Sequence, residues 1–236
     1  VIAKTKNWNQ LINITDKAYS NRIIKKEEAN ENKSIALFEI AKIKMKSDDK
    51  EAINLIEKAI SLKGNFAPFI KLYTQLLFAS NNNTKALKVL KKYWSQTPTS
   101  LLRSSITEVL KENKINEIEF IHRLISKNQN NEESKKLLID FAIYLNNWGI
   151  ARENIKGLIG SNPSKEICLF MSDIELGEFN DIQKSEGWKL RANNSVSDYC
   201  WVCKFTNNTQ KSWAALSDSG HFNSLEWVQP KMLSVL

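Results

Sequence analysis

The chain has 236 residues, 42% of them hydrophobic, and a formal net charge of +8 from 34 Lys and Arg against 26 Asp and Glu. It contains no run of about 18 apolar residues, which excludes a membrane-spanning helix in this sequence. Three cysteines, an odd number in a chain of this size, do not make a disulfide framework, and we expect a reducing compartment. The small numbers of Gly (7) and Pro (4) favour long helices joined by short turns.

The positive charge is mostly lysine and accompanies abundant Asn and Ile. We interpret it as a general compositional bias, so it is weak evidence for nucleic-acid binding, and we expect no nucleic-acid partner. A basic protein beside an anionic membrane surface agrees with the charge equally well. RNA binding by a basic helical repeat stays open as an alternative, and it would show an affinity that falls with salt.

The first part of the chain predicts helices of uneven regularity. Apolar residues from Trp8 to Ala18 recur at roughly helical spacing, and a charged stretch from Arg22 to Lys33 follows. We interpret these segments as two helices. The stripe from Ile35 to Met45 predicts a further helix, which ends at the turn Ser47–Asp49.

A pattern of small, large, small and turn residues is then written twice, 34 residues apart. This offset is the tetratricopeptide period. Each copy predicts the second helix of a helical pair, with a small residue where two helices touch and a helix breaker at the end. The first copy is Ala52, Ile56, Ala59 and Gly64, the second is Ala86, Leu90, Tyr93 and Pro98, and a third, with the same internal spacing, is Ala151, Ile155, Leu158 and Pro163.

Further pairs are predicted over residues 68–97, 101–128, 132–159 and 164–192. Pro68 lies where a helix start tolerates proline, and Thr99 or Ser100 can cap the helix that follows Pro98. In the last pair we place the turn at Gly177-Glu178. The predicted fold class is mainly α, a tetratricopeptide-like right-handed helical solenoid of about five pairs over residues 1–192.

After a polar linker at residues 193–198 the pattern changes to β-branched and aromatic residues. We predict three short strands, Trp201–Thr206, Lys211–Ser217 and His221–Val228, joined by turn sequences. They would form a small three-stranded β-meander, and residues 193–236 would be a Trp-rich β-cap packed on the last helices. The tryptophans could serve as a stacking platform for nucleic acid, or they could form the apolar face of the sheet, which we favour.

The pair Cys200 and Cys203 is the motif of the sequence that most suggests metal binding or redox chemistry. A structural zinc site needs four ligands, and only Cys168 and His221 could add to this pair. On a strand, residues three apart point to opposite faces, so we expect the two thiols to diverge. Neither His122 nor His221 has a partner at catalytic spacing, and no Gly-rich phosphate loop occurs. We therefore expect no enzymatic activity and no cofactor.

The concave face of the solenoid remains as a candidate site, because the first helix of each pair lines it. Such a groove commonly holds a peptide, and its Lys bias predicts an acidic or carboxylate-bearing protein partner. The opposite interpretation, ordinary solvated side chains, stays open. From the repeat register we expect these side chains to point into the groove: Lys44, Lys71, Gln75, Lys136, Asp140 and Tyr144.

The order of these features resembles the HemY-type tetratricopeptide proteins of bacteria, which are encoded with genes of tetrapyrrole biosynthesis. The resemblance covers roughly Trp8 to Pro230 and is closest after Trp94. Three helical segments carry it: Trp94, Pro98 and Leu101; Trp148, Ala151 and Arg152; Leu169, Met171 and Glu175. The tail carries it most specifically, through Trp201, Val202, Trp213, Ser217, Ser219, Gly220, Phe222, Leu225, Glu226, Trp227 and Pro230.

This resemblance implies an inner-membrane protein with an N-terminal anchor and a cytoplasmic repeat domain, linked to haem or porphyrin biosynthesis. The anchor is absent from this chain, which begins at Val1. No flavin fingerprint occurs, so the activity of the unrelated flavin oxidase that shares the name is not implied. We expect a non-enzymatic scaffold that binds protein partners in its groove. The alternative is a tetrapyrrole- or metal-binding protein that uses Cys200, Cys203 and His221.

Overall fold

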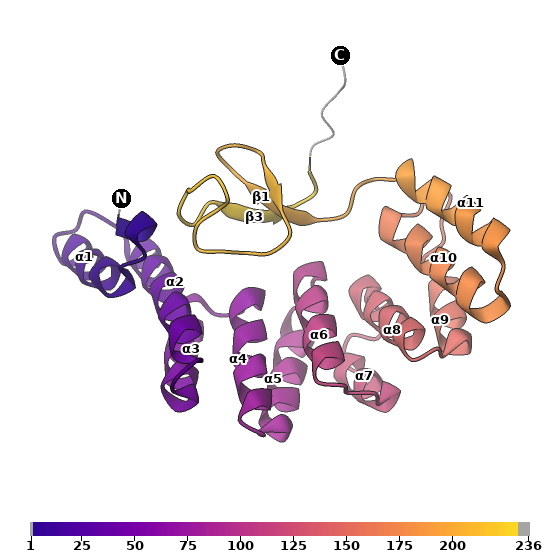
Figure 1. Cartoon of the computed structure of the whole chain (residues 1–236), viewed down its shortest axis with the longest axis horizontal. Coiled ribbons are helices and arrows are strands. Elements are labelled where there is room, and N and C mark those ends of the chain that lie inside the picture. The colour runs from indigo at the N-terminus through magenta and orange to yellow at the C-terminus, as the bar shows by residue number, and fades with distance from the viewer. Residues whose placement is uncertain (1, 231–236) are drawn as a thin grey trace, which may run out of the picture. The chain divides into compact units, whose positions relative to one another are not determined.

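The structure is a computed structural model that describes residues 2–230, and over these residues it is mainly helical with one small antiparallel sheet (Figure 1). None of the helices in this range has the length and apolar character that crossing a bilayer requires. The helices are η1 (Ile2–Thr5), α1 (Trp8–Ser20), α2 (Lys26–Lys44), α3 (Asp49–Lys63), α4 (Ala67–Ala79), α5 (Asn83–Gln96), α6 (Ser100–Glu112), α7 (Ile118–Ile125), α8 (Glu132–Tyr144), α9 (Trp148–Ile155), α10 (Lys165–Phe179) and α11 (Ile182–Asn193). The strands are β1 (Cys200–Cys203), β2 (Thr209–Gln210) and β3 (Leu225–Val228).

The chain divides into two compact units, and this division differs from the predicted one at residues 192 and 193. The first unit holds the chain up to Leu90 together with Cys200–Val228, and the second holds Lys91–Tyr199. The C-terminal sheet therefore belongs with the first helices of the chain. The boundary between the units falls inside α5.

Local sequence signals account for many of the helix ends. Thr99 caps α6 by accepting a hydrogen bond from the Leu102 amide at 3.2 Å, and Pro68 lies in the first turn of α4, as predicted. The repeated alanines Ala52, Ala86 and Ala151 are fully buried. A small side chain at each of these positions lets the helix approach its neighbours closely.

Two helix boundaries differ from the prediction. The charged stretch before Ser34 does not form a separate helix, because α2 runs from Lys26 to Lys44. Glu27 and Glu28 occupy its first turn, where carboxylates stabilise a helix. The turn predicted at Gly177-Glu178 is also wrong, since α10 continues through both residues to Phe179 and ends at Asn180, which adopts a left-handed conformation.

The sheet has the strand order β2-β1-β3, so it is not the predicted meander. A meander would place the second strand between the first and the third, whereas here β1 lies in the centre and pairs antiparallel with both neighbours. The predicted strand Lys211–Ser217 is mostly loop and contributes one isolated bridge, between Leu216 and Phe222. Two very short edge strands leave most of this segment to be held by side-chain packing.

The sheet packs on the first helices rather than on the last pair, which corrects the predicted position of the β-cap. The Trp213 ring lies edge-on to Phe38 of α2, and to Phe66 and Phe69 at the start of α4, with centroid distances of 5.2, 5.1 and 6.0 Å. Trp201 of β1 also faces Phe66, at 6.3 Å. Aromatic pairs prefer such edge-to-face geometry, so these rings both bury apolar area and orient the sheet.

In the second unit the core lies between α8, α9 and α10. Trp148, at the start of α9, lies over Gly177 of α10, where a Cβ atom would lie 2.2 Å from Cη2 of the indole. Arg152 donates hydrogen bonds to Glu175 at 3.2 Å and to Glu178 at 2.6 Å. The residues of the Trp148 to Arg152 motif thus join α9 to α10.

Candidate partner-binding surface

Three helices of the second unit form a continuous layer, since α8 contacts both α6 and α10 (Figure 1). Residues Lys136, Asp140 and Tyr144 lie four apart on α8 and therefore share one face of it. Three of the predicted groove residues are in this way brought together. The surface that these three helices form has a buried half and a solvent-accessible half.

The buried half is an ionic cluster centred on Arg103 of α6. Its Nε donates to Glu133 Oε2 of α8 at 2.8 Å, and its Nη2 donates to Glu166 Oε1 of α10 at 2.5 Å. The side chains of Arg103, Glu133 and Glu166 are 8%, 19% and 23% exposed. One guanidinium thus ties three helices together through charge-assisted hydrogen bonds.

Lys136 belongs to this cluster, and the expectation of a free ammonium in the groove does not hold for it. The residue is 8% exposed, and its Nζ lies 2.7 Å from Glu132 and within 4 Å of Glu133 and Glu166. Burial opposes the charge, but these carboxylates raise the pKa of Lys136. Lys136 therefore stays charged and neutralises its own neighbours instead of offering its charge to a partner.

At Glu166 and Asp198 burial outweighs the neighbouring positive charges. Burial raises the pKa of Glu166 although Arg103 and Lys136 lie beside it. Asp198, in the segment after α11, accepts a hydrogen bond from the Glu166 amide at 3.3 Å, and burial raises its pKa as well. The cluster thus also holds the end of the helical region against α10.

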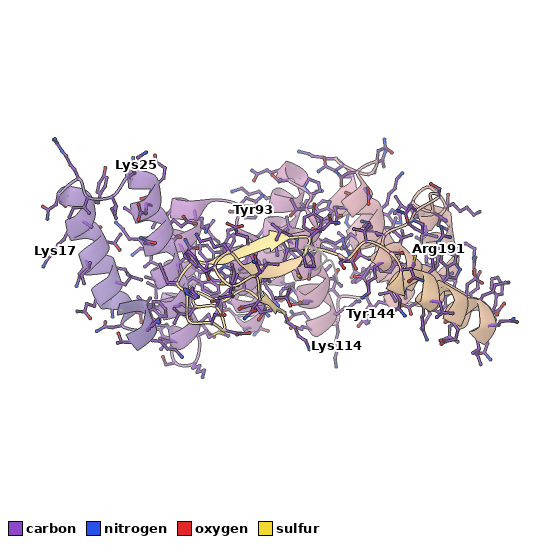
Figure 2. The ribbon with its side chains drawn as sticks, turned by 90° about the horizontal axis from the view of Figure 1, so that it is seen from above. Lys17, Lys25, Tyr93, Lys114, Tyr144 and Arg191 are labelled. Atoms are coloured by element: carbon purple, nitrogen blue, oxygen red, sulfur yellow. The ribbon has the colours of Figure 1, made fainter. Side chains whose placement is uncertain are left out.

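The accessible half begins at Lys111, in the last turn of α6. Its Nζ lies 3.1 Å from Asp140 Oδ1 and 5.2 Å from the centroid of the Tyr144 ring. The Tyr144 residue, labelled in Figure 2, is 39% exposed. These side chains present a cation, a carboxylate and an aromatic ring at one point of the layer.

Asp173 of α10 extends this group. Burial of its carboxyl and the nearby charge of Asp140 raise its pKa, whereas Lys189 and Lys111 oppose the rise. Within the described residues, no hydrogen bond or ion pair satisfies the Asp173 carboxylate. Leu169 and Leu176, at positions i−4 and i+3 from Asp173, are 39% and 41% exposed. We call the following set the layer face: Lys111, Asp140, Tyr144, Leu169, Asp173 and Leu176.

The other predicted groove residues lie in the first unit. Lys44 pairs with Glu51 across the turn between α2 and α3, at 2.6 Å, and the pair is exposed on both sides. Lys71 and Gln75 lie one turn apart on α4 and are half-buried. The first unit thus contains Lys44, Lys71 and Gln75, and the second contains Lys136, Asp140 and Tyr144.

The two cysteines of the motif both lie in β1. Cys200 and Cys203 lie at opposite ends of β1, opposite Val228 and Leu225 of β3. Cys203 Sγ lies 4.0 Å from His221 Nδ1, so two of the three alternative ligands come together. Cys200 is half-buried, and burial raises its pKa.

The surroundings of Cys203 do not fit a zinc ion. Apart from His221, the side chains near Cys203 Sγ carry hydroxyl groups, and Ser224 Oγ lies 3.4 Å away. Structural zinc prefers thiolate and imidazole ligands. The Cys203 thiol donates to Ser224 Oγ, and the Ser224 hydroxyl in turn donates to the His221 carbonyl oxygen at 3.0 Å. Hydrogen bonding with the side chains of Ser224 and Thr206 lowers the pKa of Cys203 to about 5. Within residues 2–230, no group of three or more His, Cys, Asp and Glu side chains could hold a metal ion.

The sequence patterns missed Leu169, Asp173 and Leu176 of α10, and Arg103 with Glu166. The first three occupy one exposed helical stripe, which i, i+4, i+7 spacing could have identified. Arg103, Glu133 and Glu166 follow one another at intervals of 30 and 33 residues, close to the repeat period, and each lies near the start of a first helix. Such a recurrence of charge could have predicted contact between successive pairs.

No protein-family model matches this chain, and no curated protein is significantly similar to it. The HemY-type resemblance therefore stays a prediction that rests on the residues quoted for it.

Proposed function

We propose that this chain is a non-enzymatic helical-repeat scaffold that binds a protein partner through the layer face. In this proposal the helical pairs stack as a tetratricopeptide-like right-handed solenoid, and α6, α8 and α10 line its concave side. The observation that carries the proposal is the combination of exposed Tyr144, Leu169 and Leu176 with the Asp173 carboxylate, which has no hydrogen-bond or ion-pair partner among residues 2–230.

The chemistry of the layer face suits a polypeptide. Apolar side chains interrupted by single charges match an amphipathic segment, whose apolar residues would cover Leu169 and Leu176. Asp173 would pair with a cation of the partner, which changes the expected partner from an acidic to a basic one at this point of the surface. The change arises because Lys136 is neutralised in the buried cluster and Lys111 is paired with Asp140.

The HemY-type resemblance supplies the proposed setting. The partner would be a membrane protein or an enzyme of tetrapyrrole biosynthesis, and the scaffold would hold it at the inner membrane. Support comes from the contacts of the motif residues, since Trp148 packs on Gly177 and Arg152 pairs with Glu175. Both contacts join α9 to α10 and so fix the helix that presents Asp173.

A site-specific cross-link tests the proposal. A photoreactive phenylalanine analogue at Tyr144 should give one discrete cross-linked polypeptide in a membrane extract of the source cells. The matched probe at Lys88, an exposed residue of α5, should give none. Adding Leu176→Glu to the Tyr144 probe should abolish the product, because a carboxylate would replace an apolar contact. Equal products from both probes, or a product that survives Leu176→Glu, would refute binding at the layer face.

A further inference from the structure

A hollow on α11 lies outside the layer face. Its volume is about 330 Å³, and it is lined by Lys184, Gly187, Trp188 and Arg191. These positions follow the spacing i, i+3, i+4, i+7, so a single face of α11 forms the lining. The hollow is shallow and open to solvent, so it can cover one side of a group no larger than one aromatic residue.

Arg191 supplies a cation that lacks an acidic partner. Its guanidinium carbon lies 5.2 Å from the centroid of the Trp188 ring, and Nη2 donates to the Ser161 carbonyl oxygen at 2.9 Å (Figure 2 labels Arg191). Among residues 2–230, no carboxylate forms an ion pair with it. The ring and the carbonyl hold the guanidinium in one orientation, and its remaining N–H groups are available to a ligand.

Lys184 lines the other end of the hollow, where the Asp181 carboxylate compensates its charge. Its Nζ lies 3.1 Å from Asp181 Oδ2, while Asp181 Oδ1 accepts a hydrogen bond from the Lys184 amide at 2.9 Å. The backbone N–H of Lys184, followed by the Lys184 side chain, lowers the pKa of Asp181. Asp181 is thus engaged as the N-cap of α11, and Arg191 is the less compensated cation of the two.

Gly187 leaves the centre of the hollow open. A Cβ atom at this position would have no atom within 4 Å, so packing inside the chain does not require glycine here. Glycine in a helix interior destabilises the helix by roughly 0.5 to 1 kcal/mol relative to alanine. At Gly177, by contrast, the Trp148 ring fills this space, so of these two glycines only Gly187 leaves room beside the helix for another group.

We propose that this hollow binds a carboxylate or phosphate carried on an aromatic body. The ring of the ligand lies over Gly187 and against Trp188, and its anionic group accepts hydrogen bonds from the Arg191 fork. The ligand class is an aryl carboxylate or aryl phosphate of single-residue size, either free in solution or as the C-terminal aromatic residue of a polypeptide. This site is independent of the proposed function.

Titrations followed by the Trp188 indole N–H resonance test the proposal. The signal is assigned by its disappearance in Trp188→Phe. The probes are N-acetylphenylalanine, phenyl phosphate and a tripeptide ending in phenylalanine, and the neutral control is N-acetylphenylalanine amide. We expect a saturable shift with the acids, with a Kd near 1 mM, and none with the amide. A response to the tripeptide but not to N-acetylphenylalanine would assign the site to polypeptide ends, and the reverse would assign it to free acids.

Variants make the result specific. Arg191→Gln and Gly187→Leu should each weaken binding at least about tenfold. Lys189→Gln, which removes an exposed lysine of α11 paired with Glu186, should leave it unchanged. Because Gly187→Leu enlarges an exposed position, helix content by circular dichroism should be retained, and Gly187→Ala offers a smaller filling of the same space. No saturable shift with any acid or phosphate, equal binding of the amide, or equal loss in Lys189→Gln would overturn the proposal.

Discussion

In the first unit aromatic rings attach the sheet to the helices, whereas in the second unit ion pairs join α6, α8 and α10. Trp213 meets three phenylalanine rings, and Arg103 meets two carboxylates. Apolar packing is not directional and scales with buried area, so a smaller ring keeps part of it. A buried ion pair leaves an uncompensated charge when one member is removed. The two regions should therefore respond differently to conservative and to radical substitutions.

The largest expected effect is at Arg103. Replacing it with alanine removes the hydrogen-bonded cation of Glu133 and Glu166 and leaves only Lys136 near both carboxylates, which should lower the free energy of unfolding by about 3 kcal/mol. Arg103→Lys should recover only part of this loss, because an ammonium cannot reproduce the two hydrogen bonds of the fork. Urea unfolding, with hydrogen exchange of α6, α8 and α10, measures the effect.

Arg123→Ala is the control for that experiment. Arg123 is 60% exposed and lies 3.7 Å from an exposed Glu117, so its removal should change the free energy by less than about 0.5 kcal/mol. A similar loss in both variants would mean that the buried cluster has no special role in the second unit.

Trp213→Ala should have the next largest effect. The indole is only half-buried, so we expect a loss of about 2 kcal/mol, below the range of a fully buried tryptophan. Hydrogen exchange should accelerate in Cys200–Val228 and stay unchanged in α8. Trp213→Phe should retain most of the stability, in contrast to Arg103→Lys. Equal losses in the two conservative variants would remove the distinction between the units.

Gly177 and Gly187 sharpen the comparison, because a contact with an aromatic ring, that of Trp148, also stabilises the second unit. At Gly177 a methyl group would collide with the Trp148 indole, and Gly177→Ala should destabilise the protein by roughly 1 to 2 kcal/mol after the gain in helix propensity. Gly187→Ala meets open space and should stabilise it by roughly 0.5 to 1 kcal/mol. Thermal unfolding of both variants provides the measurement, and changes of the same sign would contradict the packing described for Trp148.

The smallest effect is a difference in pH dependence between the units. The hydrogen bond from Tyr73 lowers the pKa of Glu57 below its usual 4.5, whereas burial raises the pKa of Glu166 above that value. Folded protein binds the Glu57 proton less readily than unfolded protein, so the contribution of Glu57 is present above pH 4.5 and is lost as the pH falls through its lowered pKa. For Glu166 the sign is opposite, and its contribution improves as the pH falls from its raised pKa toward 4.5.

Stability measured over a pH series separates these two groups. Glu57→Gln should reduce the loss of stability in acid, because the variant has no proton to gain there. Glu166→Gln should remove the stability that the protein gains when Glu166 is protonated, so the stability of this variant should fall more steeply in acid. If both variants change the acid side of the profile in the same direction, the assignment of opposite pKa shifts is wrong.

Local patterns predicted the mainly helical character of the chain and several helix starts. Small residues that recur at a fixed period mark positions where helices touch, even when the partner helix is unknown. Ala52, Ala86 and Ala151 are such residues, and all three are fully buried. Thr99 and Pro68 likewise act within one turn of the chain. The sheet's packing partner could not be predicted, since Trp213 and Phe38 lie far apart in sequence and nothing local to either residue specifies the contact.

The candidate surface was predictable only in part, because local spacing identifies the face of a helix but not the neighbours of that face. Helical spacing placed Lys136, Asp140 and Tyr144 on one face of α8. It could not distinguish a buried lysine from an exposed one, because Arg103 and Glu166, on the neighbouring helices, decide the surroundings of Lys136. Gly177 was misread as a turn because a glycine that accommodates a distant ring has the same local signature as one that ends a helix.

The affinity of the cross-linked partner for purified variants tests the central claim most directly. The comparison is between the wild type, Asp173→Lys and Glu153→Lys, which make the same charge reversal on the layer face and on an exposed position of α9. Binding through the layer face predicts at least about tenfold weaker binding for Asp173→Lys and wild-type affinity for Glu153→Lys. Equal affinities for all three proteins, or equal losses in the two variants, would contradict it.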